Sequence, residues 1–197
     1  AVYNMGTMTV IFFLGNIGIN LGFKLDKMLL FALVVAITAG LTSAATARFQ
    51  DRLGHKRTIM VFLVFWVVAT VGMAGSQHFG APDWAFWIIS GAIGLALGGV
   101  GTASRAMVGA FTPAHRSAEF FGVWGMVNRL SAVLGIGVFS LITSLMQPKE
   151  FGQVVGLLAV GGFFAVGFVL MARIDQGAGL LAAREAEAEK GIKDEPA

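Results

Sequence analysis

The sequence lacks cysteine altogether and contains few charged residues. Without cysteine it can form neither a disulfide framework nor a cysteine-based metal site. Only 13% of its 197 residues are charged, about half of the roughly 25% usual in soluble domains. Because 56% of the residues are hydrophobic, a water-soluble domain of this length could not bury its apolar surface. The composition therefore indicates a membrane protein.

Several sites that would indicate an enzyme are also missing. The sequence has no Gly-rich phosphate loop, no catalytic triad and no paired carboxylates, so we expect no enzyme and no cofactor. Its three histidines do not fall at metal-ligand spacing, so we expect no metal site. The basic residues are dispersed rather than gathered on one surface, which argues against nucleic acid as a partner.

Long apolar runs fill most of the chain. A helix needs about 20 mainly apolar residues to cross a bilayer, and the four prolines fall between or beyond the runs that satisfy this length. We therefore expect an all-α membrane protein whose residues 1–172 form six transmembrane helices, with a tail at 173–197. The end of the tail, 180–197, is predicted to form a short solvated helix that frays. The six predicted spans are 1–23, 28–47, 58–75, 84–104, 120–146 and 151–172.

Lysine and arginine are distributed unequally between the two sides of these spans. Six spans place both ends of the chain on one side, and that side carries ten basic residues against three on the other. By the positive-inside rule, both ends are predicted to be cytoplasmic, in the inner (plasma) membrane. The chain begins with Ala and no charged segment precedes the first apolar run. We therefore expect no signal peptide, and we expect the chain to continue a longer protein.

The stretch "ARFQDRLGHKR", residues 47–57, concentrates charge in a predicted loop between the second and third spans. One interpretation is that its basic residues only set the orientation in the membrane. The other depends on their order. Asp51 could cap a neighbouring helix N-terminus, Gly54 would allow a tight turn, and Arg52, Lys56 and Arg57 could reach carboxylates or lipid phosphates.

This stretch resembles the loop signature of the major facilitator superfamily, G-x-x-x-D-R-x-G-x-[RK]-[RK], with Ala47 in place of the first glycine. Residues 98–135 resemble one branch of that superfamily, which includes vacuolar amino-acid effluxers and their bacterial relatives. The pieces that match this branch are Ser104-Arg105, Thr112-Pro113, 118–122 ("AEFFG"), Arg129 and Leu134-Gly135.

The resemblance covers about residues 3–172 and implies the C-terminal six-helix half of a twelve-helix transporter. Such a protein moves a small-molecule substrate across the lipid bilayer by alternating access. The substrate would lie between this half and a missing N-terminal half. An amino acid is one candidate substrate. The alternative is a non-transporting membrane assembly factor or scaffold built on a degenerate transporter fold.

Charged residues near the predicted cytoplasmic ends are candidates for a gate. Arg105 lies where the fourth span ends, and Glu119 opens the fifth, where it could pair with Arg105 or with the basic loop. A network of such pairs could bias the rocking of two halves, although the two could also be unrelated interfacial charges. The candidate gate residues are Asp51, Arg52, Gly54, Lys56, Arg57, Arg105 and Glu119.

Arg129 is the charged residue that lies inside a predicted span. It follows Glu119 by ten residues, about 15 Å along a helix. Because an arginine in hydrocarbon costs at least about 2.5 kcal/mol, we expect it to face a polar cavity or an ionic partner. Asn128 is predicted to point elsewhere on the same helix. Both interpretations of Arg129, substrate contact and structural pairing, stay open.

Polar side chains in the first span are further cavity candidates. Asn16 and Asn20 are one helical turn apart and share a face. These two asparagines, like Tyr3 and Asn4 earlier in the span, could line a pathway or could hydrogen-bond one helix to another. The Gly94-x-x-x-Gly98 pair of the fourth span predicts close helix packing. The candidate substrate or cavity residues are Tyr3, Asn4, Asn16, Asn20, Asn128 and Arg129.

Overall fold

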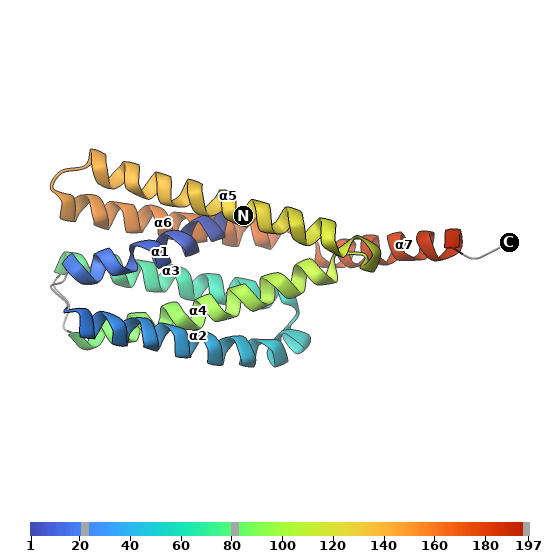
Figure 1. Cartoon of the computed structure of the whole chain (residues 1–197), viewed down its shortest axis with the longest axis horizontal. Coiled ribbons are helices and arrows are strands. Elements are labelled where there is room, and N and C mark those ends of the chain that lie inside the picture. The colour runs from blue at the N-terminus through green and yellow to red at the C-terminus, as the bar shows by residue number, and fades with distance from the viewer. Residues whose placement is uncertain (21–23, 80–82, 195–197) are drawn as a thin grey trace.

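The protein is an all-α membrane protein. A computed structural model describes residues 1–20, 24–79 and 83–194, which form seven α-helices and one 3-10 turn and contain no strand (Figure 1). The helices are α1 (Val2–Asn20), α2 (Leu25–Leu53), α3 (His55–Phe79), α4 (Asp83–Ala110), α5 (Ser117–Leu145), α6 (Lys149–Arg173) and α7 (Gln176–Asp194), and the turn is η1 (Ala114–Arg116).

Five long apolar stretches could cross a membrane within the described part of the chain: 25–53, 55–76, 84–110, 114–145 and 151–173. Each includes most of one of the last five predicted spans. Helix α1 contains a shorter apolar stretch, Val2–Phe13. The first of the six predicted spans therefore stays a prediction.

The charged stretch at 47–57 is not the loop that we predicted. Helix α2 continues to Leu53, and α3 begins at His55, so Gly54 alone separates the two helices. Gly54 has a φ of 82°, a conformation that L side chains rarely adopt, and its N–H donates to the carbonyl of Gln50 at 2.9 Å. The predicted tight turn at Gly54 is confirmed, and the residues before it are helical.

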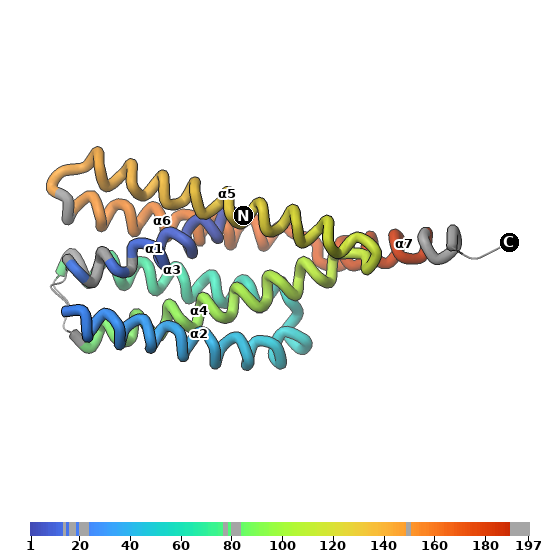
Figure 2. The backbone as a smooth tube through the Cα atoms, in the orientation of Figure 1, coloured from blue at the N-terminus to red at the C-terminus, as the bar shows by residue number. Residues whose placement is uncertain are grey.

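Helices α1 to α6 form two groups of three. Helices α2, α3 and α4 contact one another, as do α1, α5 and α6, and α3 packs against α6 to join the groups. Figure 1 shows α5 and α6 along one side, α2 and α4 along the other, and α1 and α3 between them. The backbone trace follows the same arrangement (Figure 2).

Helices α1, α2 and α3 correspond in order to α4, α5 and α6, and this correspondence relates one group to the other. Helix α1 packs on α5 and α6, just as α4 packs on α2 and α3. Because successive helices alternate in direction, α1 and α4 run in opposite directions along the bundle (Figure 1). This is the pattern of an inverted repeat, which many transporter folds share.

Two glycines allow α4 to approach α2 closely. A Cβ at Gly94 would lie 2.6 Å from the carbonyl oxygen of Val35, and a Cβ at Gly98 would collide with the carbonyl oxygen of Ala39. Close approach of this kind increases the van der Waals contact that holds membrane helices together. The predicted close packing at Gly94-x-x-x-Gly98 is therefore confirmed.

One end of the bundle brings together the Gly54 turn, η1 and the junction between α6 and α7. We call it the Gly54 end; it lies toward the α7 side of Figure 1. The N–H of Lys56 donates to Oε1 of Gln176 at 3.3 Å. Helix α7 extends from this end away from the bundle (Figure 1).

The tail is more than the solvated helix that we predicted at 180–197. Helix α7 begins at Gln176, and Ala183 is 8% exposed. Oε1 of Glu187 accepts a hydrogen bond of 2.9 Å from the N–H of Ala114, at the start of η1. A Cβ at Gly179 would lie 2.9 Å from the ring of Phe111. The helix therefore packs against the connection between α4 and α5.

Candidate functional site

A cleft of about 550 Å³ lies between α1, α2, α4 and α5. None of the described residues that line it belongs to α3 or α6, the two helices that join the two groups. Aliphatic side chains and glycines make up part of its wall. Its polar lining residues are Tyr3, Asn4, Thr7, Ser43, Thr102, Ser104, Arg105, Asn128 and Arg129.

The structure brings four of the six predicted cavity residues to this one cleft. Tyr3 and Asn4 reach it from α1, and Asn128 and Arg129 reach it from α5. The prediction that Asn128 points elsewhere is wrong, because neighbouring positions of α5 both border the wide cleft. The side chains of Asn16 and Asn20 lie outside the described residues. Arg105, predicted as a gate residue, lines the cleft as well.

Hydrogen bonds across the cleft wall tie the helices together in pairs. The hydroxyls of Tyr3 and Ser104 are 2.7 Å apart and connect α1 to α4. Nδ2 of Asn4 donates to the backbone oxygen of Asn128 at 3.0 Å and connects α1 to α5. Tyr3 and Asn4 therefore serve both of the alternatives that the sequence left open, since they line the cleft and bond one helix to another.

Sequence reasoning missed a hydroxyl pair on the opposite wall. The side-chain oxygens of Ser43 and Thr102 are 2.6 Å apart and connect α2 to α4. Both residues are small and lie close to other hydroxyl residues, Ser43 after Thr42 and Thr102 before Ser104, so they give little periodic signal. Their contribution to the cleft depends on two helices whose contacting residues are 59 positions apart.

The cleft carries positive charge. Arg105 and Arg129 both line it, and no aspartate or glutamate is among the described residues that do. The guanidinium carbon of Arg105 lies 5.9 Å from the ring centroid of Trp124, within the range of a cation–π contact. Arg129 is exposed and forms no hydrogen bond or ion pair with any residue in the described part of the chain. The geometry favours the cavity interpretation of Arg129 over structural pairing.

Glu119 has a different partner from the two that we considered. Its carboxylate accepts two hydrogen bonds from Arg116, at 2.8 Å from Nε and 2.7 Å from Nη2. The predicted pairing with Arg105 or with the basic loop is wrong. Residues three apart at a helix start are already neighbours, so this ion pair forms without any tertiary contact.

The remaining gate candidates lie around the Gly54 turn. Three of them, Asp51, Arg52 and Arg57, are exposed. Within the described ranges, none of their side chains has a hydrogen-bond partner. Because α2 continues to Leu53, Asp51 is inside a helix rather than positioned as the predicted cap of another. The predicted gate residues therefore do not form one connected network in this structure.

Among the gate candidates at the Gly54 turn, Lys56 has a side chain with hydrogen-bond partners. Its Nζ donates to the carbonyl oxygens of Ala172 at 2.8 Å and Ile174 at 2.7 Å. These carbonyls end α6 and its junction with α7, and backbone carbonyls at a helix C-terminus have no partner within the helix. The ammonium group also interacts favourably with the negative end of the helix dipole. Lys56 thus holds α3 to the end of α6.

We expect Lys56→Met to lower the stability of the folded protein by about 0.3–1 kcal/mol, the usual value of a cation at a helix C-terminus. The methylene stem is kept, so the loss reports the charge and the two hydrogen bonds. Thermal unfolding in detergent would measure it. Arg52→Met, in the same turn but without a partner in the described residues, is the matched control. Equal effects of the two substitutions would contradict this role for Lys56.

The comparisons with known proteins agree with this architecture. The profile of the family described as "vacuole effluxer Atg22 like" matches residues 1–184. No curated protein sequence matches the chain. The profile covers all six helices of the two groups and the first half of α7. The chain therefore belongs to the Atg22-like vacuole effluxer family, a family of membrane transporters rather than enzymes.

Proposed function

We propose that this chain is the C-terminal half of a secondary active transporter, with residues 1–172 as its transmembrane part and 173–197 as its tail. It would move a small solute by alternating access, with the cleft facing a second six-helix half. The inverted repeat of α1–α3 and α4–α6 supports this proposal, since transporter folds place their substrate sites at repeat interfaces. We further propose the inner (plasma) membrane, with both ends of the chain cytoplasmic.

The observation that carries the proposal is the pair of arginines in the cleft. Arg105 and Arg129 line the same space without a carboxylate among the described lining residues. A guanidinium in a low-dielectric site binds a carboxylate with two parallel hydrogen bonds. Helix α1 contributes two neutral polar groups to the same cleft, the amide of Asn4 and the hydroxyl of Tyr3. We infer a solute with an anionic group, and an amino-acid carboxylate fits this chemistry.

We expect Arg129→Ala to reduce transport by about tenfold or more, because a hydrogen bond to a charged group is worth about 1.5–3 kcal/mol. The measurement is uptake of labelled amino acids into proteoliposomes that hold the full-length transporter. Arg184→Ala, on the exposed side of α7, removes the same charge outside the cleft and is the control. If Arg129→Ala transports at the normal rate, Arg129 does not hold the solute.

A second measurement distinguishes a transporter from a non-transporting scaffold. A panel of amino acids is added to the purified protein, and the thermal unfolding midpoint is recorded for each. A transporter is stabilised by the solute that it binds, whereas a scaffold shows no solute-dependent shift. The shift should disappear in Arg129→Ala and persist in Arg184→Ala.

A further inference from the structure

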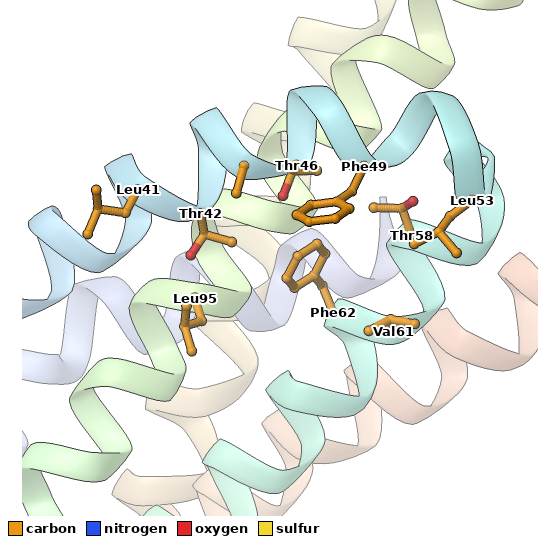
Figure 3. A pocket seen from close by; sticks show the side chains of 10 residues that line it. Leu41, Thr42, Thr46, Phe49, Leu53, Thr58, Val61, Phe62 and Leu95 are labelled. Atoms are coloured by element: carbon orange, nitrogen blue, oxygen red, sulfur yellow. The ribbon is translucent and has the colours of Figure 1, made fainter.

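An apolar groove of about 410 Å³ opens between α2, α3 and α4, apart from the cleft (Figure 3). The rings of Phe49, from α2, and Phe62, from α3, face one another across it. Thr42 and Thr58 also line the groove, but their hydroxyls donate to the carbonyls of Thr38 and Gly54 within their own helical segments. Thr46 lines it as well, and its buried hydroxyl has no hydrogen-bond partner among the described residues. Apart from this one hydroxyl, the groove presents hydrocarbon.

A basic pocket of about 820 Å³ lies at the Gly54 end, where α3 begins and α6 meets α7. Arg57 and Arg173 line it, both are exposed, and neither has an ion-pair partner within the described ranges. Asp175 also lines the pocket, but its Oδ1 accepts the N–H groups of Gly177 at 2.8 Å and Ala178 at 3.1 Å, at the start of α7. Lys56 lines the pocket too, but its Nζ donates to the carbonyl oxygens of Ala172 and Ile174. Among the described side chains, the guanidiniums of Arg57 and Arg173 are therefore the basic groups of this pocket without a hydrogen-bond partner.

The groove and the pocket adjoin one another. Leu53 lines both of them. Arg57 lines the pocket, and Val61, one helical turn further along α3, lines the groove. Leu53 is 51% exposed and Phe49 is 59% exposed, so the shared edge is open. A continuous surface thus runs from the guanidiniums of Arg57 and Arg173 to the apolar groove.

We propose that this surface binds one anionic phospholipid, with its phosphate between Arg57 and Arg173 and one acyl chain in the groove. Guanidinium groups bind phosphate with charge-assisted, bidentate hydrogen bonds. Basic pockets at the membrane surface between helices are suited to lipid headgroups. The groove offers space for a hydrocarbon chain, and a free phosphate ion would leave that space empty. The lipid is a bound component of the fold and is separate from the solute in the cleft.

Native mass spectrometry of the purified full-length protein tests the proposal. The protein is released from detergent in the presence of dioleoyl phosphatidylglycerol or dioleoyl phosphatidylcholine, and the population with one bound lipid is titrated. We expect the phosphatidylglycerol complex to form at lower lipid concentration. Replacing Arg57 or Arg173 with Gln should weaken it about fivefold each, the equivalent of about 1 kcal/mol per basic residue.

Two pairs of variants separate the headgroup from the chain. Arg57→Gln is compared with Arg184→Gln, which removes an exposed arginine of α7 elsewhere. Ala45→Phe, which fills the groove, is compared with Ala47→Phe, an exposed position of α2 outside it. We expect Arg57→Gln and Ala45→Phe to weaken phosphatidylglycerol binding and their controls to leave it unchanged. Circular dichroism spectra confirm that each variant is folded.

Two further probes distinguish the source of the phosphate. Inorganic phosphate and dihexanoyl phosphatidylglycerol compete with the long-chain lipid for Arg57 and Arg173. If inorganic phosphate displaces the lipid at comparable concentration, the site takes a free anion and the proposal is wrong. Equal binding of phosphatidylcholine, or binding that the Arg57→Gln and Ala45→Phe variants leave unchanged, would also overturn it.

Discussion

Replacing Gly98 with alanine is expected to separate α4 from α2 and to destabilise the protein by about 1–3 kcal/mol. A Cβ at this position would occupy the space of the Ala39 carbonyl oxygen. A backbone atom cannot rotate away as a flexible side chain can, so the two helices must move apart. In a bilayer, helix association depends on close van der Waals contact and has little hydrophobic driving force. The added methyl group therefore weakens the contact between α2 and α4, which is the main contact of their group.

Gly91→Ala is the matched control for this substitution. It lies two turns earlier on α4, and a Cβ there would meet nothing within 4 Å. Because alanine is the better helix former by about 1 kcal/mol, Gly91→Ala should be neutral or slightly stabilising. Steric trapping or thermal unfolding in detergent would compare the two. If both variants unfold at the same temperature, the close approach of α2 and α4 does not contribute to stability.

Replacing Trp66 with alanine is expected to have an even larger effect, a loss of about 3 kcal/mol or more. Trp66 is fully buried, and its ring stacks on Phe164 with centroids 4.8 Å apart and an angle of 13° between planes. This contact joins α3 to α6, the contact that holds the two groups together. Removing the indole leaves a cavity at that junction, and the lost dispersion contacts have no replacement.

Trp66→Phe is the informative comparison. Nε1 of Trp66 has no hydrogen-bond partner in the described part of the structure, so phenylalanine would lose little polar interaction and would keep an aromatic ring on Phe164. We expect Trp66→Phe to retain most of the stability that Trp66→Ala loses. The unfolding free energy of both variants in mixed micelles would show this. Equal losses would mean that the full volume of the indole, which phenylalanine cannot fill, is what this junction requires, and that an aromatic ring on Phe164 does not suffice.

Local chemistry accounts for the contacts that could be predicted. The turn at Gly54 follows from a backbone conformation that glycine adopts at low cost. The closeness of α4 to α2 follows from two glycines one helical turn apart. The ion pair of Arg116 and Glu119 is also predictable from the sequence, because a spacing of three residues on a helix makes the two side chains neighbours. The nearer partner therefore takes precedence over the distant ones that the sequence analysis considers for Glu119.

The cleft was only partly predictable. Arg129 was identified from the cost of an arginine in hydrocarbon, which requires no knowledge of neighbouring helices. The hydroxyl residues that share the cleft with it, Ser43, Thr102 and Ser104, were not identified. Ser104 lies opposite Tyr3, 101 residues earlier in the chain, and their hydrogen bond exists only because α1 and α4 face one another. Arg105, which we had assigned to the gate, joins the cleft for the same reason.

The sequence alone determined that the chain lies in a membrane and is helical, because long uncharged runs must be helices in lipid, where every backbone group needs an internal partner. The tertiary structure alone decided which polar residues share a site. It placed Arg105 and Arg129 beside Tyr3 and left Glu119 outside. Packing between helices selects one face of each, and that selection depends on van der Waals contacts between distant segments that no local pattern records.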